Sequence, residues 1–408
     1  MANEAVAGNA IPLIRTVPGQ HPQPSDPRVS RQAERPFAVR GAIEATLTAF
    51  LTGEVGALDE IDPAAGDFGR TAQDAVLAGG KRIRPVFAYW GWRGVVGGSE
   101  PVAPVLPALA ALELLHAFAL VHDDVMDASA TRRGRPSAHR ALAAQHAAAG
   151  RTGDGDRFGE AAAVLVGDLC LVWADRLLGH ANLPAATILE ARRCYDQMRV
   201  ETVAGQYLDV LSETAVSSWS LDRAMRVARY KTACYTVQRP LLFGAALADL
   251  RRDGPLAAAY HRYGLAVGEA FQLCDDLLGV YGDPRTTGKP AGEDLLRNKP
   301  TGLLMLAREL ATPAQRAVLD GVRPTPADSA APGGSTAPDG SAAPDGGSAG
   351  SVRELAEVVR ATGAVDRIER LIADRVDEAL TALDSSPIDP AARHALGELA
   401  VSATQRRA

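Results

Sequence analysis

The chain has 408 residues, of which 47 % are hydrophobic and only 5 % aromatic, and its formal net charge is −6. This length allows a deep core built mainly from Ala, Leu and Val, a composition that favours packed helices over strands. No basic surface points to nucleic acid as a partner, and no apolar run reaches the length of a membrane span. Because the N-terminus also lacks the pattern of a signal peptide, we expect a cytoplasmic protein.

The first residues differ in composition from the rest of the chain. Residues 1–35 are rich in Pro, Gln and Ala without periodicity, which predicts a disordered N-terminal segment. From Gly41 to Val322, apolar residues recur at helical spacing in runs broken by short Gly or Pro segments. Residues 324–351 form a low-complexity insert, and helical periodicity resumes at Val352. We therefore expect one all-α domain over residues 36–408, interrupted by a disordered loop at 324–351.

An apolar helical segment, PALAALELLHAFALVHDDVMD, ends in three aspartates. In a helix, Asp123 and Asp127 lie one turn apart on one face, and Asp124 lies beside them. Three carboxylates at a helix C-terminus oppose one another and the helix dipole, and a hard divalent cation such as Mg²⁺ would relieve this conflict. The alternative is a solvated helix end whose aspartates pair with Arg132 and Arg133.

A second apolar segment, GLAVGEAFQLCDDLLGVYGD, runs into Asp275 and Asp276. Two acidic helix ends suit a bundle whose helices face each other across a cavity, and metal ions held between them would form a diphosphate site. The cations that such a ligand also needs occur in GGKRIRP, TRRGRP, RYKTACYT and TTGKPAGEDLLRNK. These segments contain all four lysines of a chain with 43 basic residues, namely Lys81, Lys231, Lys289 and Lys299. An arginine-rich coding bias with four chance exceptions is the alternative explanation.

With both aspartate motifs, GKRIRP and KT in this order between Ala75 and Thr301, the chain resembles the trans-type polyprenyl (isoprenyl) diphosphate synthases, and geranylgeranyl diphosphate synthases most closely. The resemblance implies an all-α bundle of the isoprenoid-synthase type around a deep apolar cavity, usually a homodimer. It also implies the reaction. An allylic diphosphate (dimethylallyl, geranyl or farnesyl) ionises, the double bond of isopentenyl diphosphate attacks the cation, and a proton is lost.

The resemblance further implies a role for each matched residue. Three Mg²⁺ ions would be held by the aspartates Asp123, Asp124, Asp127, Asp275 and Asp276. The allylic diphosphate would be contacted by Arg132, Lys231, Lys289 and Gln272. The diphosphate of isopentenyl diphosphate would be held by Lys81, Arg84, His116 and Arg133. The region where the carbocation forms would be lined by Gln206, Asp209 and Thr232, and Lys299 would belong to the lid over the metals.

Product length is expected to depend on the depth of the apolar pocket. Phe118 lies five residues before Asp123, roughly 7 Å deeper along the helix, and its neighbour Ala119 is small. An aromatic residue at this depth resembles geranylgeranyl diphosphate synthases and predicts a twenty-carbon product, with a farnesyl or a longer-chain product as alternatives. Phe118 as an ordinary core residue is the competing interpretation.

Two features depart from the family pattern. Gly279 stands where many members have the third aspartate of the second motif, and a glycine cannot bind metal. The insert at 324–351 has no counterpart that we can match. Two other classes of function stay open. A terpene cyclase shares the aspartate-rich helix end but has no use for GGKRIRP, and a non-catalytic partner subunit would keep the fold while losing metal ligands that are intact here.

Overall fold

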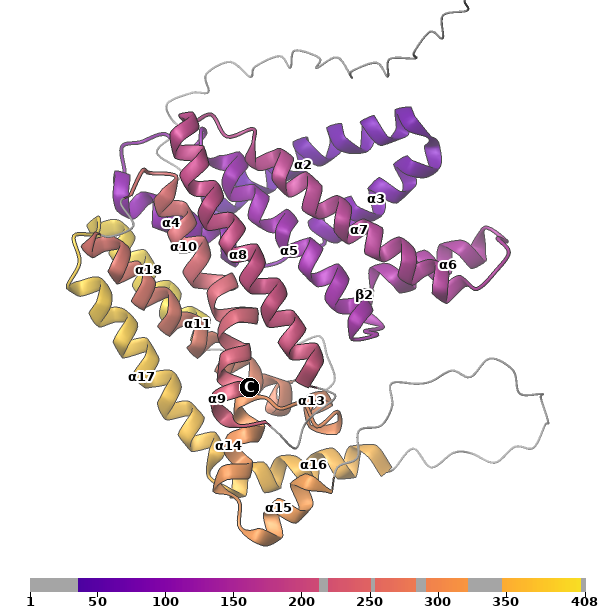
Figure 1. The fold of residues 1–408 in the computed structure, drawn as a ribbon, viewed down its shortest axis with the longest axis vertical. Coiled ribbons are helices and arrows are strands. Elements are labelled where there is room, and N and C mark those ends of the chain that lie inside the picture. Colours follow the sequence, from indigo (N-terminus) through magenta and orange to yellow (C-terminus); the bar gives the residue numbers. More distant parts are fainter. Residues whose placement is uncertain (1–35, 213–218, 251–253, 284–290, 322–346, 405–408) are drawn as a thin grey trace, which may run out of the picture.

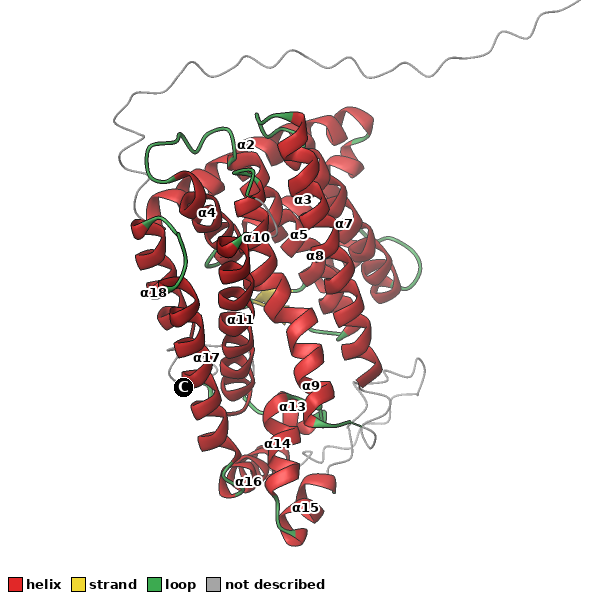
Figure 2. Cartoon of the chain, turned by 60° about the vertical axis from the view of Figure 1, so that its left-hand side comes forward, coloured by secondary structure: helices red, strands yellow, loops and turns green. Residues whose placement is uncertain are grey.

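The computed structural model describes residues 36–212, 219–250, 254–283, 291–321 and 347–404. These residues form the expected all-α bundle (Figures 1 and 2). Its α-helices are α2 (Pro36–Ile61), α3 (Pro63–Leu77), α4 (Ile83–Val96), α5 (Leu106–Met126), α6 (Ala138–Ala148), α7 (Gly155–Leu178), α8 (Ala185–Ser212), α9 (Leu221–Val227), α10 (Arg239–Ala246), α11 (Pro255–Tyr281), α13 (Glu293–Leu296), α14 (Gly302–Leu310), α15 (Pro313–Asp320), α16 (Gly347–Ala361), α17 (Ala364–Asp384) and α18 (Pro390–Thr404). The π-helix η2 (Ala228–Gln238) joins α9 to α10.

The predicted disordered segments fall mostly outside the described residues. Residues 1–35 and 324–346 lie outside them, so both predictions stay predictions. Residues 347–351, predicted as the end of the insert, instead form the first turn of α16. The physical reason is helix propagation: once Val352–Ala361 is helical, adding a residue to its end requires no new nucleus.

Helix α5 carries the first aspartate motif at its C-terminal end and is apolar on nearly all sides. Its residues 108–115 are all buried, as expected for a helix that is hydrophobic all round and lies in the core. Contrary to the expectation from sequence, α5 is long and apolar enough to cross a membrane, with a mean hydropathy of 1.3 over its best window. Since 56 % of that window is buried inside the protein and a core helix meets the same criterion, this is weak evidence for a span.

Helices α4 and α10 approach closely, and glycine makes this possible. A Cβ atom on Gly244 would lie 1.7 Å from the carbonyl oxygen of Ala88, and one on Gly91 would lie 2.1 Å from that of Leu241. No side chain fits at either position, so these glycines let the two backbones touch. The contact places η2, which continues directly into α10, beside the start of α4.

Helix α11 carries the second aspartate motif and is covered by the C-terminal helices. Figure 2 shows α17 and α18 along one side of it. The hydroxyl of the fully buried Tyr263 donates a hydrogen bond to the carbonyl of Leu396 on α18 at 2.7 Å. Glu269, also buried, accepts from Arg229 of η2 at 2.9 Å and pairs with Arg375 of α17 at 2.9 Å. This carboxylate fixes three elements to one another.

A short β-hairpin follows α5, with β1 (Thr131–Arg132) paired antiparallel to β2 (Arg135–Pro136). Its two turn residues, Arg133 and Gly134, have φ values of 54° and 72°. A two-residue hairpin turn with both central residues at positive φ matches the twist of the strands it joins. The tight turn returns the chain toward the end of α5 and so aims Arg132 at the aspartates.

Candidate active site

The first aspartate motif lies where α5 meets α8, η2 and the loop after α13. Asp123 accepts hydrogen bonds from the amide of Gln206 at 3.0 Å and from the ammonium of Lys231 at 3.2 Å. Arg132 approaches its other oxygen at 3.3 Å. Burial favours the neutral carboxyl, but the charges of Lys231 and Arg132 outweigh it and hold the pKa of Asp123 below its ordinary value. Asp123 is therefore ionised at neutral pH.

Asp209 connects two of the four lysines. Its Oδ2 accepts from Lys231 at 2.5 Å and from Lys299 at 2.9 Å. Burial opposes ionisation here as well, but the charges of Lys299 and Lys231 lower the pKa of Asp209. The predicted residues Asp123, Gln206, Asp209, Lys231 and Lys299 thus form one contiguous polar cluster.

Asp124 is bound to Arg132. The residue is 3 % exposed, and its Oδ1 accepts from two nitrogens of Arg132, one of them Nε at 2.9 Å. The alternative in which arginines neutralise the helix end is therefore correct for Arg132 and Asp124. Arg133 does not take part, because it donates to the carbonyl of Gly79 instead.

Asp127 is the carboxylate of the motif for which the described residues supply no counter-charge in contact. Within the described part of the chain no donor contacts its side chain, and only its backbone carbonyl accepts, from Arg297 at 3.3 Å. Burial and the neighbouring charge of Asp123 raise the pKa of Asp127. A cation between Asp123 and Asp127 would relieve this repulsion, so the pair fits the Mg²⁺ expected of the first motif.

The described residues contain no group of three or more His, Cys, Asp or Glu side chains that could hold a metal ion by themselves. Mg²⁺ is commonly bound by one or two carboxylates together with water and substrate phosphate oxygens, so a magnesium site would not need such a group. The donor set of α5 is thus compatible with a metal that arrives with a diphosphate.

The two aspartates of the second motif have different surroundings. Asp276 is 6 % exposed, and its oxygens accept from the amide of Gln272 at 2.8 Å and from the backbone N–H of Gly302 at 3.0 Å. Burial raises the pKa of Asp276 to about 7. Asp275 is half-buried. Gln272 and Gly302 thus hold Asp276 in place, and the metal assignments of both aspartates stay predictions.

The segment from Asp294 to Gly302 links the two acidic helix ends. Gly302 binds Asp276 of α11, Lys299 binds Asp209 of α8, and Arg297 binds the end of α5. The charges of Asp209 and Asp294 raise the pKa of Lys299 in spite of its burial, so its ammonium stays charged. Lys289, predicted nearby, lies outside the described residues.

The site also contains a carboxylate beside the glycine that departs from the family pattern. A Cβ atom on Gly279 would lie 3.1 Å from Oδ2 of Asp294, and the Gly279 carbonyl accepts from the backbone N–H of Gly292 at 2.7 Å. The space next to residue 279 is thus taken by the Asp294 side chain, which comes from α13 rather than α11.

A second polar group lies between α4, α5 and η2. Arg84 donates to the hydroxyl of Thr236 at 3.0 Å and places its guanidinium 4.1 Å from the ring centre of Tyr235. His116 approaches the hydroxyl of the same tyrosine at 3.4 Å. Burial, together with the charges of Arg84 and Arg133, lowers the pKa of His116 well below its ordinary value. Lys81, predicted to belong here, is exposed.

Glycine also sets the position of the KT motif. A Cβ atom on Gly205 of α8 would lie 2.4 Å from the backbone nitrogen of Lys231. Only glycine lets η2 approach α8 this closely, and the approach carries Lys231 to Asp209 on the next turn of α8. The predicted residue Thr232 follows Lys231 on the same segment and is half-buried.

Phe118 and Ala119, predicted to set product length, are half-buried and pack against the core. The ring of Phe118 meets the ring of His122 edge-on, with centroids 4.8 Å apart, and Nε2 of His122 lies 2.9 Å from the carbonyl oxygen of Val164. Phe118 therefore lies toward α7, and its role in product length stays a prediction.

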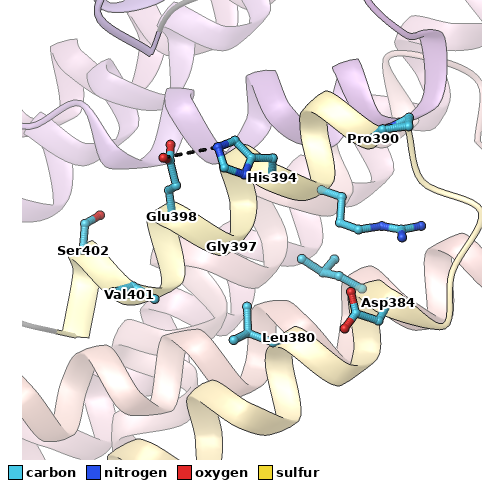
Figure 3. Close-up of a pocket in the computed structure, with 10 residues that line it drawn as sticks. Leu380, Asp384, Pro390, His394, Gly397, Glu398, Val401 and Ser402 are labelled. Atoms are coloured by element: carbon cyan, nitrogen blue, oxygen red, sulfur yellow. Dashed lines mark ion pairs between the residues drawn. The ribbon is translucent and has the colours of Figure 1, made fainter.

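Two surface pockets lie away from the two aspartate motifs. One, of about 670 Å³, lies between α17 and α18; Figure 3 shows its lining, with an ion pair of 3.3 Å between His394 and Glu398. The other, of about 640 Å³, is lined by α9, α14 and α15. Neither pocket is lined by a residue of the two aspartate motifs, so neither is the candidate active site.

The family model of polyprenyl synthetase matches residues 68–330, which is well over half of the chain. The chain belongs to the polyprenyl synthetase family. This confirms the family, the all-α fold and the class of enzyme predicted from the sequence.

Individual members of the polyprenyl synthetase family give further detail. A geranylfarnesyl diphosphate synthase of Aeropyrum pernix is 31 % identical over 254 residues, covering 61 % of this chain and 72 % of that protein. A geranylgeranyl diphosphate synthase of Mycobacterium tuberculosis is 36 % identical over 228 residues, covering 56 % and 58 %. The crystal structure of a Corynebacterium glutamicum geranylgeranyl pyrophosphate synthase, complexed with isoprenyl diphosphate and magnesium, superposes with a TM-score of 0.80 at 36 % identity, covering 90 % of this chain and 99 % of that one. These names imply products of different length, so membership of the family does not fix the product.

Sequence reasoning missed several residues that hold this family's motifs in place. Tyr235 and Thr236 contact Arg84, and both lie in the quoted segment RYKTACYT. Arg82, in GGKRIRP, turns inward to Glu113 at 2.8 Å; each of these two side chains is 3 % exposed. A charged residue in an otherwise apolar run, such as Glu113 or Glu269, was the available signal, because a buried charge requires a partner.

Proposed function

We propose that this protein is a Mg²⁺-dependent prenyltransferase that condenses isopentenyl diphosphate with dimethylallyl, geranyl or farnesyl diphosphate and makes mainly geranylgeranyl diphosphate. The observation that carries the proposal is the cluster in which Asp123 and Asp209 hold Lys231 and Lys299 at the end of the apolar helix α5. Fixed cations beside an unrelieved carboxylate pair, with an apolar interior behind them, suit a ligand that has a charged head and a hydrocarbon tail.

In this proposal the residues of the first cluster bind and activate the allylic substrate. Asp123, Asp127 and Asp275 would hold Mg²⁺, which when bound would stabilise the negative charge that develops on the departing diphosphate. Lys231 and Arg132 offer fixed positive charge at the same place, so they stabilise the diphosphate as the allylic C–O bond breaks.

The apolar interior has its own part in the proposed reaction. The buried run on α5 excludes water, which protects the carbocation until the double bond of isopentenyl diphosphate attacks it. The proton lost from the condensation product can pass to the released diphosphate, which balances charge without another protein base. Arg84 and His116 would hold the diphosphate of the second substrate beside this apolar interior.

The experiment incubates the purified full chain with Mg²⁺, isopentenyl diphosphate and each allylic diphosphate in turn, and sizes the dephosphorylated products. A twenty-carbon alcohol that disappears with EDTA and returns with added Mg²⁺ supports the whole proposal. Elongation to another length keeps the prenyltransferase and rejects the product. A folded protein that elongates no starter points instead to a cyclase or a partner subunit.

The product length rests on Phe118. If its ring limits the pocket, Phe118→Ala should lengthen the product by at least one five-carbon unit. Phe243, a fully buried phenylalanine of α10, provides the control, because Phe243→Ala opens a cavity of the same kind in another part of the core. Unchanged products from the Phe118 variant would make it an ordinary core residue.

The expected homodimer has a candidate surface on α8. Val200, Val203, Tyr207 and Val210 are all exposed and follow one another at helical spacing on one face. Helix α7 presents exposed Leu165 and Val172, and Arg199 of α8 binds Asp175 of α7 at 3.1 Å, so the two helices are neighbours. An apolar stripe of this length is unfavourable in water. We propose that a second copy of this chain covers it.

A further inference from the structure

The π-helix η2 brings the two predicted diphosphate sites into contact with one segment. Lys231, near its start, reaches Asp123 and Asp209. Tyr235 and Thr236, one turn later, reach Arg84 of α4 and His116 of α5 instead. Short π-helical segments are uncommon and often occur at functional sites. The residues of η2 beyond Lys231 therefore need an explanation of their own.

Tyr235 makes two contacts of different kinds. Its ring lies 4.1 Å below the guanidinium carbon of Arg84, a distance typical of a cation–π interaction. Its hydroxyl lies 3.4 Å from Nδ1 of His116, with the two ring centroids 6.2 Å apart. The side chain is only 4 % exposed, so the protein interior fixes its orientation.

The guanidinium of Arg84 has two contacts on η2, but not all of its N–H groups are hydrogen-bonded. Tyr235 supports the plane of the guanidinium and Thr236 accepts from one terminal nitrogen at 3.0 Å. Its Nε is buried and has no partner among the described residues. A buried N–H without an acceptor is uncommon in proteins, so this guanidinium is held by fewer hydrogen bonds than it could make.

The contact with His116 also bears on which nitrogen of that ring donates. Burial and nearby arginines lower the pKa of His116, and burial raises that of Tyr235 to about 12, so the imidazole is neutral and the phenol keeps its proton at neutral pH. The phenol can then donate to Nδ1, which places the imidazole proton on Nε2. In that tautomer Nε2–H is a donor to an anionic ligand.

We infer that Tyr235 is a positioning residue for the second substrate: it holds the guanidinium of Arg84 with its ring and sets the donor face of His116 with its hydroxyl. The inference rests on the proposed function, in which Arg84 and His116 bind the diphosphate of isopentenyl diphosphate. It assigns no contact between Tyr235 and the substrate itself. Its effect should therefore be specific to one of the two substrates.

The test separates the two contacts with Tyr235→Phe, which removes the hydroxyl, and Tyr235→Leu, which also removes the ring. Tyr195 provides matched controls, because it is a fully buried tyrosine with Arg199 4.7 Å from its ring centre and a hydroxyl without a partner in the described residues. Calorimetric titration with isopentenyl diphosphate measures its affinity without turnover, and steady-state kinetics give KM for each substrate.

We expect Tyr235→Phe to weaken the affinity for isopentenyl diphosphate about three- to tenfold, and Tyr235→Leu to weaken it about ten- to thirtyfold. The KM for the allylic substrate should change less than twofold, and Tyr195→Phe and Tyr195→Leu should leave both constants within twofold. In an Arg84→Lys background the effect of Tyr235→Leu should shrink, because the two residues act through one contact.

These measurements distinguish failure of the proposed function from failure of the positioning role of Tyr235. If the unaltered protein does not bind isopentenyl diphosphate, the proposed function fails and the inference fails with it. If it binds while Tyr235→Phe and Tyr235→Leu bind equally well, only the inference is wrong. Equal losses for both substrates, or a drop in Tm with unchanged affinity, would make Tyr235 a structural residue and overturn the positioning role.

Discussion

The ammonium nitrogen of Lys231 lies 2.5 Å from Oδ2 of Asp209, and the same oxygen accepts a hydrogen bond from Lys299 at 2.9 Å. One carboxylate of α8 thus orients a lysine of η2 and a lysine of the loop after α13. Both lysines lose conformational freedom before a substrate arrives, which lowers the entropy lost on binding.

Asp209→Asn should reduce kcat/KM about 10- to 100-fold, because each lysine loses a charge-assisted hydrogen bond and with it a defined position. Steady-state kinetics with the allylic substrate varied would measure the loss. Asp222→Asn, in an exposed pair with Arg226 on α9, is the control and should keep full activity. Normal kcat/KM in Asp209→Asn would show that the lysines do not need this carboxylate.

Gly205→Ala should displace η2, since the added methyl group would lie 2.4 Å from the backbone nitrogen of Lys231. Overpacking of this kind destabilises by about 1 to 3 kcal/mol, and activity should fall further because Lys231 moves. Gly53→Ala, on α2, has nothing within 4 Å and should stabilise slightly. Chemical unfolding and activity of both variants would check this, and full activity in Gly205→Ala would contradict it.

His116 should make the protein less stable in acid. Its pKa is lowered in the folded state, so below the ordinary pKa near 6.5 the unfolded chain binds a proton more readily than the folded one. The free energy of unfolding therefore decreases as the pH is lowered. His116→Asn should flatten the fall between about pH 6.5 and 5. Parallel profiles for His116→Asn and the unaltered protein would count against the shift.

Gly279→Asp, which restores the common form of the second motif, should lower activity. The new side chain would start 3.1 Å from Asp294 and place a second carboxylate beside it. Gly279→Ala tests the steric part alone, so the difference in kcat/KM between the two variants reports like-charge repulsion. A rise in activity with Asp would mean that the family's third aspartate is needed here too.

Val203→Asp should convert a dimer into monomers, because it places a charge in the middle of the apolar stripe on α8. Sedimentation velocity at several protein concentrations would show the change in mass. Val318→Asp, at an exposed valine of α15, should leave the mass unchanged. If the unaltered protein sediments as a monomer, the proposed dimer is wrong.

The sequence predicted the helices and the acidic ends of α5 and α11, because periodicity and the spacing of Asp123 and Asp127 are local properties. Helical periodicity alone could not separate Asp275 from Asp276, although the family resemblance implied Asp275 as the direct ligand with Asp276 in support. Neighbouring residues of a helix point about 100° apart, and only the fold shows that Asp276 turns toward Gly302.

The pairing of Arg132 with Asp124 depends on a hairpin turn that periodicity does not reveal. The structure places Arg133 and Gly134 of this turn at positive φ, a conformation that the glycine favours and the arginine does not. The contacts of Asp123 with Gln206 and Lys231 join positions far apart in the sequence, so a single sequence contains no direct record of them.

The covering of α11 by α17 and α18 has a consequence for how the protein is made. The helix that carries Asp275 leaves the ribosome well before the residues that bury it, since Tyr263 is anchored by Leu396 and Glu269 by Arg375. Until α17 and α18 emerge, the nascent chain exposes an apolar face of α11 that invites aggregation or chaperone binding. The two aspartate motifs can therefore be assembled into one site only after α17 and α18 have been synthesised.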